Sequence, residues 1–205
     1  MHLPARWRSV VSATTVALAA TALAAAPATA DTGPSPGGCP EVPTVQPFAP
    51  WQDFADYFLA PDGDFEAGGS AWLLEDGASV VEGNEPFVGA PGDHRSLRLP
   101  AGASATTAPM CIGEEHRTMR YFGTGAKSGA LVVEALYTKR NGKEKSVKLD
   151  VAQGTGRWAP SDVVPMRVNE RAGEDNALSV SLRFTARGNA LWQIDDVYVD
   201  PYKTK

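Results

Sequence analysis

The residues of this sequence that could do chemistry are its carboxylates, three histidines and two cysteines. Glu66 and Asp195 could supply the two carboxylates that glycoside hydrolysis needs in one cleft. His94 lies in a loop rich in Gly and Asp, and His116 lies in a charged turn, so both are typical of surface histidines. The sequence has no G-x-S-x-G, P-loop or H-E-x-x-H motif. An enzyme with an unrecognised site is therefore the least favoured class, and no catalytic residue is predicted.

The first thirty residues are organised like a secretory signal. Arg6 and Arg8 give a positive start, an apolar run follows from Val10 to Ala26, and Ala28-Thr29-Ala30 resembles a small-residue cleavage site. The apolar run is short and rich in Ala and Thr for a membrane-spanning helix. No later segment is long and apolar enough to span a membrane. We therefore expect a secreted protein from which residues 1–30 are removed, with an uncleaved anchor as the alternative.

Export would place both cysteines, Cys39 and Cys111, in an oxidising environment, where a pair is usually a disulfide. Neither cysteine is flanked by a basic or histidine residue that would activate a thiolate. The sequence therefore predicts a Cys39–Cys111 disulfide, and the alternative is a pair of free buried thiols.

Composition limits the partners and the fold class. The formal net charge of −5 argues against nucleic acid as the main partner, because phosphate binding needs a basic face. The 20 glycines and 16 prolines indicate many turns and short strands. Residues 31–61 form a Pro-rich extended segment that we expect to pack on the domain. Within it, Trp51–Leu59 predicts one short helical turn, which Pro61 ends.

From residue 62 to residue 205 the pattern is one of strands and turns. Apolar and polar residues alternate strictly from Leu178 to Thr185, as in a half-buried strand. Asn141-Gly142 predicts a type I′ hairpin turn between two further strands. Strands at a spacing of about ten residues indicate an all-β antiparallel sandwich. The other expected strands are Ala71–Glu75, Ala78–Glu82, Ser96–Leu99, Ala103–Cys111, Arg117–Gly123, Gly129–Arg140, Lys143–Val151, Val163–Val168 and Leu191–Asp200.

The last expected strand changes phase in its middle. Trp192 and Ile194 share one face, but the two valines that follow have the opposite parity. One extra residue at Asp195-Asp196, a β-bulge, would bring all four apolar side chains to the same face. It would also turn a carboxylate in an unusual direction.

Three pieces of the sequence resemble the galactose-binding-domain-like jelly-roll superfamily, in particular carbohydrate-binding modules of families four, nine and twenty-two. Asp62–Glu66 followed by Trp72 is similar to their opening strand. His94–Leu99 resembles their next landmark, a Ser-Leu strand after a glycine, and Gln193–Val199 resembles their closing strand. The pieces bracket residues 62–200, and the resemblance implies a jelly-roll β-sandwich for that part of the chain.

The resemblance also implies a structural Ca²⁺ where the first and last strands meet. It would lie near Asp64 or Glu66 and near Asp195 or Asp196. Ca²⁺ prefers several oxygen ligands, both carboxylates and carbonyls, and a bulge frees backbone carbonyls. The alternative is that the two aspartates of the last strand accept hydrogen bonds from backbone N–H groups.

A carbohydrate ligand is the functional expectation that follows from the resemblance. Sugar binding would need aromatic side chains with polar neighbours, and the tryptophans of the opening and closing strands match core positions. Trp158, Tyr121 and Tyr137, with Arg120 beside Tyr121, are left as candidate ligand contacts, and Trp51 is a further aromatic outside the core pattern. We expect a secreted non-catalytic module that binds extracellular or cell-wall carbohydrate. The alternative is a structural or protein-interaction module of the cell envelope without a sugar site.

Overall fold

The computed structural model describes residues 39–139, 141–168 and 177–201. The predicted signal sequence, residues 1–30, lies outside the described residues, as does Arg140 at the predicted hairpin. Within the described ranges, no helix is long and apolar enough to cross a membrane.

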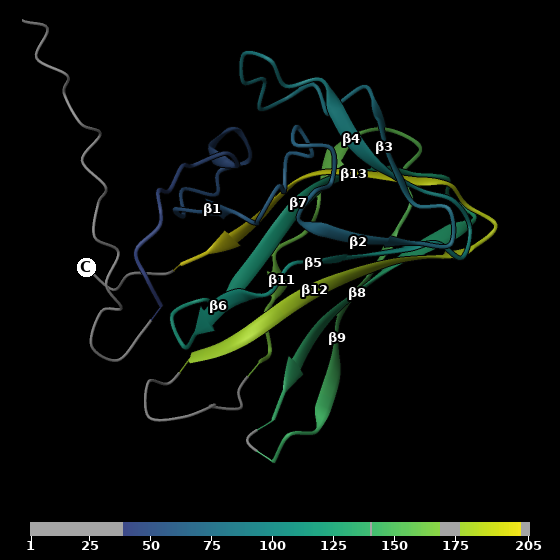
Figure 1. Cartoon of the computed structure of the whole chain (residues 1–205). Helices are drawn as coiled ribbons and strands as arrows, with labels where there is room; N and C mark the ends of the chain where they lie inside the picture. Colours follow the sequence, from purple (N-terminus) through teal and green to yellow (C-terminus); the bar gives the residue numbers. More distant parts are fainter. Residues whose placement is uncertain (1–38, 140, 169–176, 202–205) are drawn as a thin grey trace, which may run out of the picture. The chain divides into compact units, whose positions relative to one another are not determined.

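Two antiparallel sheets make up the fold, and they face one another (Figure 1). The seven-stranded sheet consists, in order, of β10 (Ala159–Pro160), β7 (Thr118–Gly125), β13 (Trp192–Asp200), β4 (Arg95–Leu99) and β3 (Ser79–Glu82), with β1 (Phe58–Leu59) beside β13 and β11 (Val164–Pro165) beside β7. The six-stranded sheet consists of β2 (Trp72–Glu75), β5 (Ser104–Thr107), β12 (Ala177–Gly188), β8 (Gly129–Thr138) and β9 (Glu144–Gln153), with β6 (Met110–Gly113) beside β12. The predicted all-β antiparallel sandwich is confirmed.

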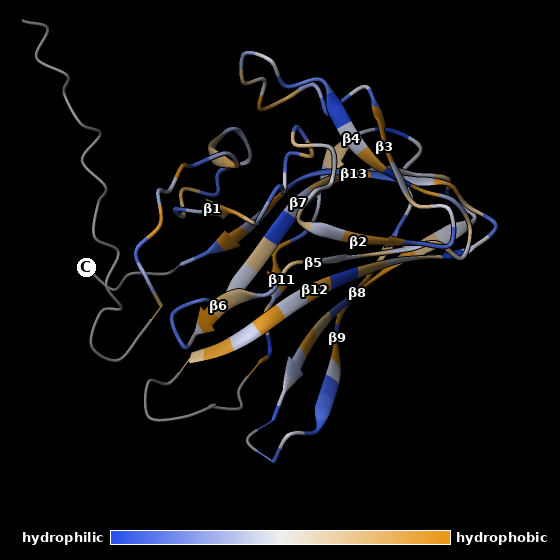
Figure 2. Ribbon diagram, in the orientation of Figure 1, coloured by the Kyte–Doolittle hydropathy of each residue, from blue (hydrophilic) through white to orange (hydrophobic). Residues whose placement is uncertain are grey.

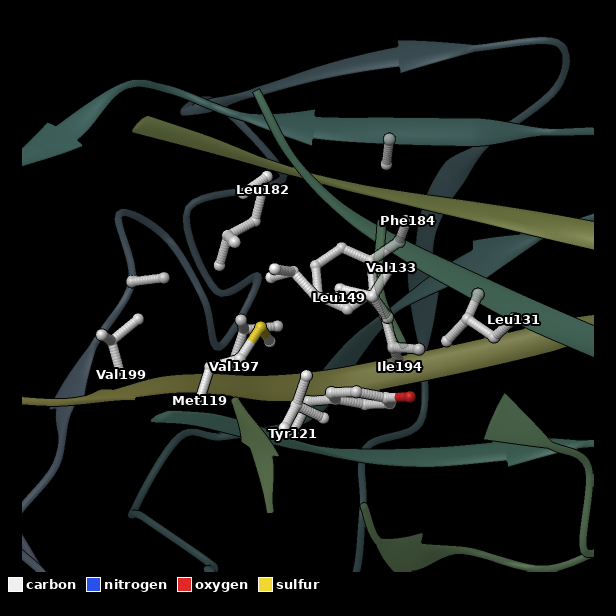
Figure 3. Close-up of a cluster of buried hydrophobic side chains, with 14 of the residues drawn as sticks. Met119, Tyr121, Leu131, Val133, Leu149, Leu182, Phe184, Ile194, Val197 and Val199 are labelled. Atoms are coloured by element: carbon white, nitrogen blue, oxygen red, sulfur yellow. The ribbon is translucent and has the colours of Figure 1, made fainter. Parts of the chain in front are cut away.

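The core lies between the sheets because the long strands alternate apolar and polar residues. In β12, Val180, Leu182 and Phe184 are fully buried, whereas the residues between them are at least partly exposed. Figure 2 shows the same alternation as orange and blue bands along the strands. Figure 3 shows Leu182 and Phe184 of β12 with side chains of β7, β8, β9 and β13 in one cluster.

The predicted β-bulge in the last strand is confirmed. The ladder between β13 and β7 shifts register between Asp195 and Tyr198, and Asp196 has a φ of +48°. The extra residue brings Val197 into the same cluster as Ile194. Asp195 and Asp196 are thereby buried at the bulge, with 0% and 3% exposure.

Three local predictions were wrong in detail. The predicted strand Ala103–Cys111 is interrupted and forms β5 and β6, because Pro109 between them has no N–H for a ladder. Of the predicted strand Val163–Val168, only Val164 and Pro165 pair with β7. At the hairpin between β8 and β9, the N–H of Gly142 donates to the carbonyl of Lys139, so Gly142 is the last residue of the turn and Asn141-Gly142 is not the central pair that the predicted type I′ turn requires.

Trp51–Leu59 does not form the predicted helical turn. The only helical residues there are the 3₁₀ turn η1 (Ala49–Trp51), which ends at Gln52 with a left-handed φ of +63°. The segment continues extended, and Phe58 and Leu59 become β1 on the edge of β13. Pairing with β13 satisfies backbone groups that a short isolated helix would leave exposed.

The N-terminal segment is attached to the sandwich by covalent, aromatic and charged contacts. The predicted disulfide between Cys39 and Cys111 is confirmed, with Cα atoms 5.5 Å apart. Phe48 packs in a second buried cluster with Tyr57, Phe122 and Tyr198. This cluster lies apart from the main core and involves residues of β7 and β13, so the segment from residue 39 to residue 59 is part of the folded structure.

Candidate functional site

A groove of about 600 Å³ crosses the outer face of the six-stranded sheet. Strands β5, β8, β9 and β12 supply its lining, because alternate residues of each strand point away from the core. The lining is rich in hydroxyl groups and includes the apolar side chains of Pro109 and Leu136 and the charged side chains of Glu144, Lys145 and Arg183.

A charged pair lies at this groove, because Arg183 lines it and pairs with Glu134. Arg183 of β12 and Glu134 of β8 are directly opposite in the ladder, and Nε and Nη2 of Arg183 donate to Oε2 of Glu134 at 3.0 Å and 2.7 Å. Ser146 of β9 donates to Oε1 of Glu134 at 2.6 Å. Burial alone would raise the pKa of Glu134, but the hydrogen bonds from Ser146 and Arg183 and the arginine charge lower it. Glu134 is therefore ionised at neutral pH, and the remaining N–H groups of Arg183 can meet a ligand.

Of the four predicted ligand residues, Tyr137 is the one that lies at this groove. Its side chain belongs to the core and is 6% exposed, so it lines the groove without offering an open ring face. Among the described residues that line the groove, no other aromatic side chain is present. Recognition on this face would therefore depend on hydrogen bonds more than on ring stacking.

The structure places Tyr121 and Arg120 elsewhere. Tyr121 is 1% exposed and packs edge-on against Phe184 inside the sandwich (Figure 3). In place of the predicted ligand contact, Arg120 donates to Oδ2 of Asp53 at 2.8 Å and to the carbonyl of Ser161. The Arg120 guanidinium also lies 4.3 Å from the ring centroid of Phe48. Arg120 therefore fixes the N-terminal segment on β7.

Trp158 is half-buried against the second aromatic cluster and does not line the groove. Among the described residues, the exposed aromatic rings belong to the N-terminal segment and to the loop after β3. Trp51 is 36% exposed and meets Phe87 edge-on at 5.2 Å, and Phe87 is 45% exposed. Sequence patterns did not single out Phe87, since a lone phenylalanine in a Gly- and Pro-rich loop has no periodicity.

A buried group of carboxylates surrounds the bulge of β13. Carboxylate oxygens of Glu85, Asp93 and Asp196 lie within 4.8 Å of one another. Glu85 is fully buried, and its carboxylate accepts hydrogen bonds from the backbone N–H groups of Phe87 and Val88. We call Glu85, Asp93 and Asp196 the carboxylate cluster.

Asp195 supports the carboxylate cluster from the other side of the bulge. Its Oδ2 accepts the backbone N–H of Glu85 at 3.0 Å, and its Oδ1 accepts that of Asp196 at 2.9 Å. Backbone hydrogen bonding was the alternative for the aspartates of this strand, and Asp195 makes these bonds. In Asp196, by contrast, Oδ2 has no hydrogen-bond partner among the described residues, and the same holds for Oδ1 of Asp93.

The electrostatics of the carboxylate cluster are unfavourable without a cation. Burial and neighbouring negative charges raise the pKa of Asp196 to about 8, and burial raises the pKa of Asp195 to about 9. Burial and the charges of Glu66, Asp64 and Glu85 raise the pKa of Asp93. Buried oxygens without partners and mutually repelling carboxylates are the features that a divalent cation would relieve.

Asp64 and Glu66 lie near the carboxylate cluster, as the charges acting on Asp93 indicate. Oε1 of Glu66 accepts the backbone N–H groups of His94 and Arg95 at 2.8 Å and 2.7 Å. Burial would raise the pKa of Glu66, but these two bonds lower it. Glu66 therefore holds the loop that carries Asp93. The sequence did not predict Glu85 and Asp93, because they lie in a Gly- and Pro-rich loop and carry no motif.

Comparison with known proteins supports the fold and not a family. No protein-family model and no curated protein match this sequence. The tandem CBM22-1–CBM22-2 domain of Paenibacillus barcinonensis Xyn10C matches with a TM-score of 0.51 and 15% identity, over 73% of this chain and 46% of that one. A family 16 carbohydrate-binding module matches with a TM-score of 0.47 and 17% identity, over 69% of this chain and 99% of that one. TmCBM61 in complex with β-1,4-galactotriose matches with a TM-score of 0.42 and 19% identity, over 69% of this chain and 96% of that one. The chain has the jelly-roll fold of carbohydrate-binding modules, as the resemblance predicted.

Proposed function

We propose that this protein is a secreted, non-catalytic module that binds an extracellular or cell-wall polysaccharide in the groove on its six-stranded sheet. The observation that carries the proposal is the ion pair between Arg183 and Glu134, fixed by Ser146 in a hydroxyl-lined groove. A jelly-roll fold shared with carbohydrate-binding modules supports it by analogy.

The groove suits a sugar chain chemically. Sugar hydroxyls both donate and accept hydrogen bonds, and the groove offers both partners in Arg183, Glu144 and the hydroxyl group of Ser181. Leu136 and Pro109 provide apolar surface for the C–H groups of a sugar ring. Because the sheet holds these groups in place, binding would cost little reorganisation.

Glu134 is poorly suited to glycoside hydrolysis. A general acid in that reaction needs a raised pKa so that it carries a proton at working pH. Ser146 and Arg183 lower the pKa of Glu134, and the carboxylate accepts bonds on both oxygens. This supports the non-catalytic part of the proposal.

We further propose that the carboxylate cluster holds a structural Ca²⁺. The residues fit the ion: Glu85, Asp93 and Asp196 provide hard oxygen donors, and two buried oxygens lack hydrogen-bond partners among the described residues. Asp64 and Glu66 would add negative charge nearby, and Asp195 would hold the bulge. Bound Ca²⁺ would neutralise the cluster and join the loop after β3 to the last strand.

A second function is favoured by one observation. Among the described residues, the exposed aromatic rings Trp51, Phe54 and Phe87 lie outside the groove, on the N-terminal segment and the loop after β3. Exposed apolar side chains of this kind are typical of protein contacts. If the groove does not bind glycans, a protein-interaction module of the cell envelope is the alternative.

The proposed function is tested by retention of the purified protein on insoluble polysaccharides, for example xylan, galactan and purified cell wall, with Ca²⁺ and with a chelator. We expect retention on at least one polymer, and stronger retention with Ca²⁺. Absence of retention on all of these polymers under both conditions would contradict the proposal and favour the protein-interaction alternative.

A further inference from the structure

A second pocket, of about 360 Å³, lies at the open edge between the two sheets and is separate from the groove. Tyr121 and Gly123 of β7 and Trp192 of β13 line it from one sheet. The end of β9, from Asp150 to Gln153, lines it from the other, and residues 159–162 complete it. We call it the edge pocket. Its volume is at the small end of the range for ligand sites.

Two buried hydrogen-bond donors at the edge pocket have no partner. The hydroxyl of Tyr121 and the indole Nε1 of Trp192 make no hydrogen bond among the described residues. The two side chains are 1% and 3% exposed, so bulk water does not satisfy them in this structure. A buried donor without a partner is costly and rare in folded proteins. The two side chains therefore indicate a site for acceptor atoms.

Two carboxylates complement these donors. The ladder between β8 and β9 shifts register beside Val133, and Asp150 pairs with Val133, which is fully buried. The irregularity therefore brings Asp150 to the inner side of β9, where a charged side chain is unusual. Asp162 lies at the outer rim of the same pocket. Neither aspartate forms an ion pair within the part of the chain that the structure describes.

The mixture of groups selects the class of ligand. A cation would pair with Asp150 and Asp162, but it could not accept hydrogen bonds from Tyr121 and Trp192. An anion would accept from those donors, but it would be repelled by two carboxylates. Neutral hydroxyl groups do both, because each donates to one group and accepts from another. Ala152 and Pro160 add apolar surface for the carbon skeleton.

We infer that the edge pocket binds one neutral sugar ring, either a free monosaccharide or the end residue of a glycan. Ring hydroxyls accept from Tyr121 and Trp192 and donate to Asp150 and Asp162. This site does not depend on the groove, since the two sites share no lining residue and lie on different surfaces.

Nuclear magnetic resonance of the tryptophan indole groups tests this inference, because Trp192 Nε1–H is itself a proposed contact. The protein is titrated with D-xylose, D-galactose and D-glucose to about 100 mM, which detects millimolar dissociation constants. We expect the Trp192 indole resonance, assigned with Trp192→Phe, to shift with at least one sugar. Tyr121→Phe, which removes only the unpaired hydroxyl, should weaken that binding about fivefold. Asp150→Asn should weaken it at least as much.

Matched controls separate a local effect from a general one. Tyr198→Phe removes a buried tyrosine hydroxyl outside the edge pocket and should leave the titration unchanged. The indole resonance of Trp158 should not move. Methyl glycosides of the same sugars distinguish a free monosaccharide from the end residue of a glycan. Binding of both the free sugar and its methyl glycoside indicates a site for a chain end, and binding of the free sugar alone indicates a monosaccharide site.

Two results would overturn the inference. One is a Trp192 indole resonance that stays fixed with all three sugars, which would leave only trapped water as the partner of these donors. The other is sugar binding by Tyr121→Phe and Asp150→Asn with the same dissociation constant as the wild type. If polysaccharide retention fails while the Trp192 shift persists, the proposed function fails and the edge pocket stands.

Discussion

The backbone N–H of Glu85 donates to Oδ2 of Asp195 at 3.0 Å, across 110 residues of sequence. This bond joins the loop after β3 to the bulge of β13 and brings the Glu85 carboxylate next to that of Asp196. The carboxylate cluster therefore depends on a strand irregularity and on one long-range backbone bond. Its members repel one another, so its properties should respond strongly to a divalent cation.

Calcium should raise the melting temperature of the protein. An ion that binds only the folded state at about 100 times its dissociation constant adds about 2.7 kcal/mol to the free energy of unfolding. Asp196→Asn should abolish this effect, because it removes one of the proposed ligand carboxylates. It should also stabilise the calcium-free protein, because a buried carboxyl group whose pKa is raised to about 8 destabilises the folded state at neutral pH. The measurement is thermal unfolding with Ca²⁺ and with a chelator.

Asp76→Asn is the matched control for calcium, since Asp76 also has a positive φ but is exposed and outside the cluster. It should keep the full calcium response. An unchanged melting temperature at millimolar Ca²⁺ would rule out the proposed site.

Acid should loosen the N-terminal segment through Asp53. Burial would raise the pKa of Asp53, but hydrogen bonds from Tyr57 and Arg120 lower it below 3.8. A group with a lowered pKa in the folded state stabilises above its unfolded pKa, and that stability is lost as pH falls through the folded pKa. The contribution of Asp53 is therefore complete near neutral pH, begins to fall at about pH 4, where the unfolded-state carboxyl is protonated, and is lost as pH falls through the lower folded-state pKa.

Asp53→Asn tests this dependence by urea unfolding at pH 7 and at lower pH. The variant should be about 2 kcal/mol less stable at pH 7, because it weakens the bond to buried Arg120. The difference from the wild type should shrink on acidification. A constant difference from pH 7 to pH 3 would show that Asp53 does not contribute through its charge.

Removing the disulfide should destabilise the protein substantially. Cys39 and Cys111 are 72 residues apart, and closing a loop of that length restricts the unfolded chain by about 4 kcal/mol in the chain-entropy model. The double variant Cys39→Ser/Cys111→Ser should lose stability of this order in denaturant unfolding, and peptide mapping without reductant should recover the linked peptides. Free thiols at both positions in the native protein would contradict the pairing.

The strands could be predicted from the sequence where a residue pattern was compatible with only one kind of secondary structure. Strict alternation from Leu178 to Thr185 can satisfy only a half-buried strand, and β12 contains it. The bulge at Asp195-Asp196 was predictable because four apolar residues had to share a face. Trp51–Leu59 was misjudged because aromatic spacing also fits an extended segment that packs on a sheet edge. The segment is extended because Phe58 and Leu59 can pair with β13, and the sequence of the segment alone does not reveal this pairing.

The candidate sites were less predictable, because they depend on contacts between distant residues. Arg120 beside Tyr121 suggested a ligand contact, but its partner Asp53 lies 67 residues away and cannot be inferred from spacing. Glu85 and Asp93 carry no motif and come close to Asp196 only when their loop folds against β13. The pair of Arg183 and Glu134 depends on the register of β12 and β8, which the pattern of each strand alone does not specify.

The most direct test of the central claim compares Arg183→Ala with Arg98→Ala in polysaccharide retention. Arg98 is the control because it is also an arginine on a strand, but β4 belongs to the opposite sheet, away from the groove. With retention measured on the polymer that binds the wild type, we expect Arg183→Ala to bind at least about tenfold more weakly, because a charged hydrogen bond is lost. Arg98→Ala should bind like the wild type. Equal retention of both variants, each with a native melting curve, would contradict glycan binding in the groove.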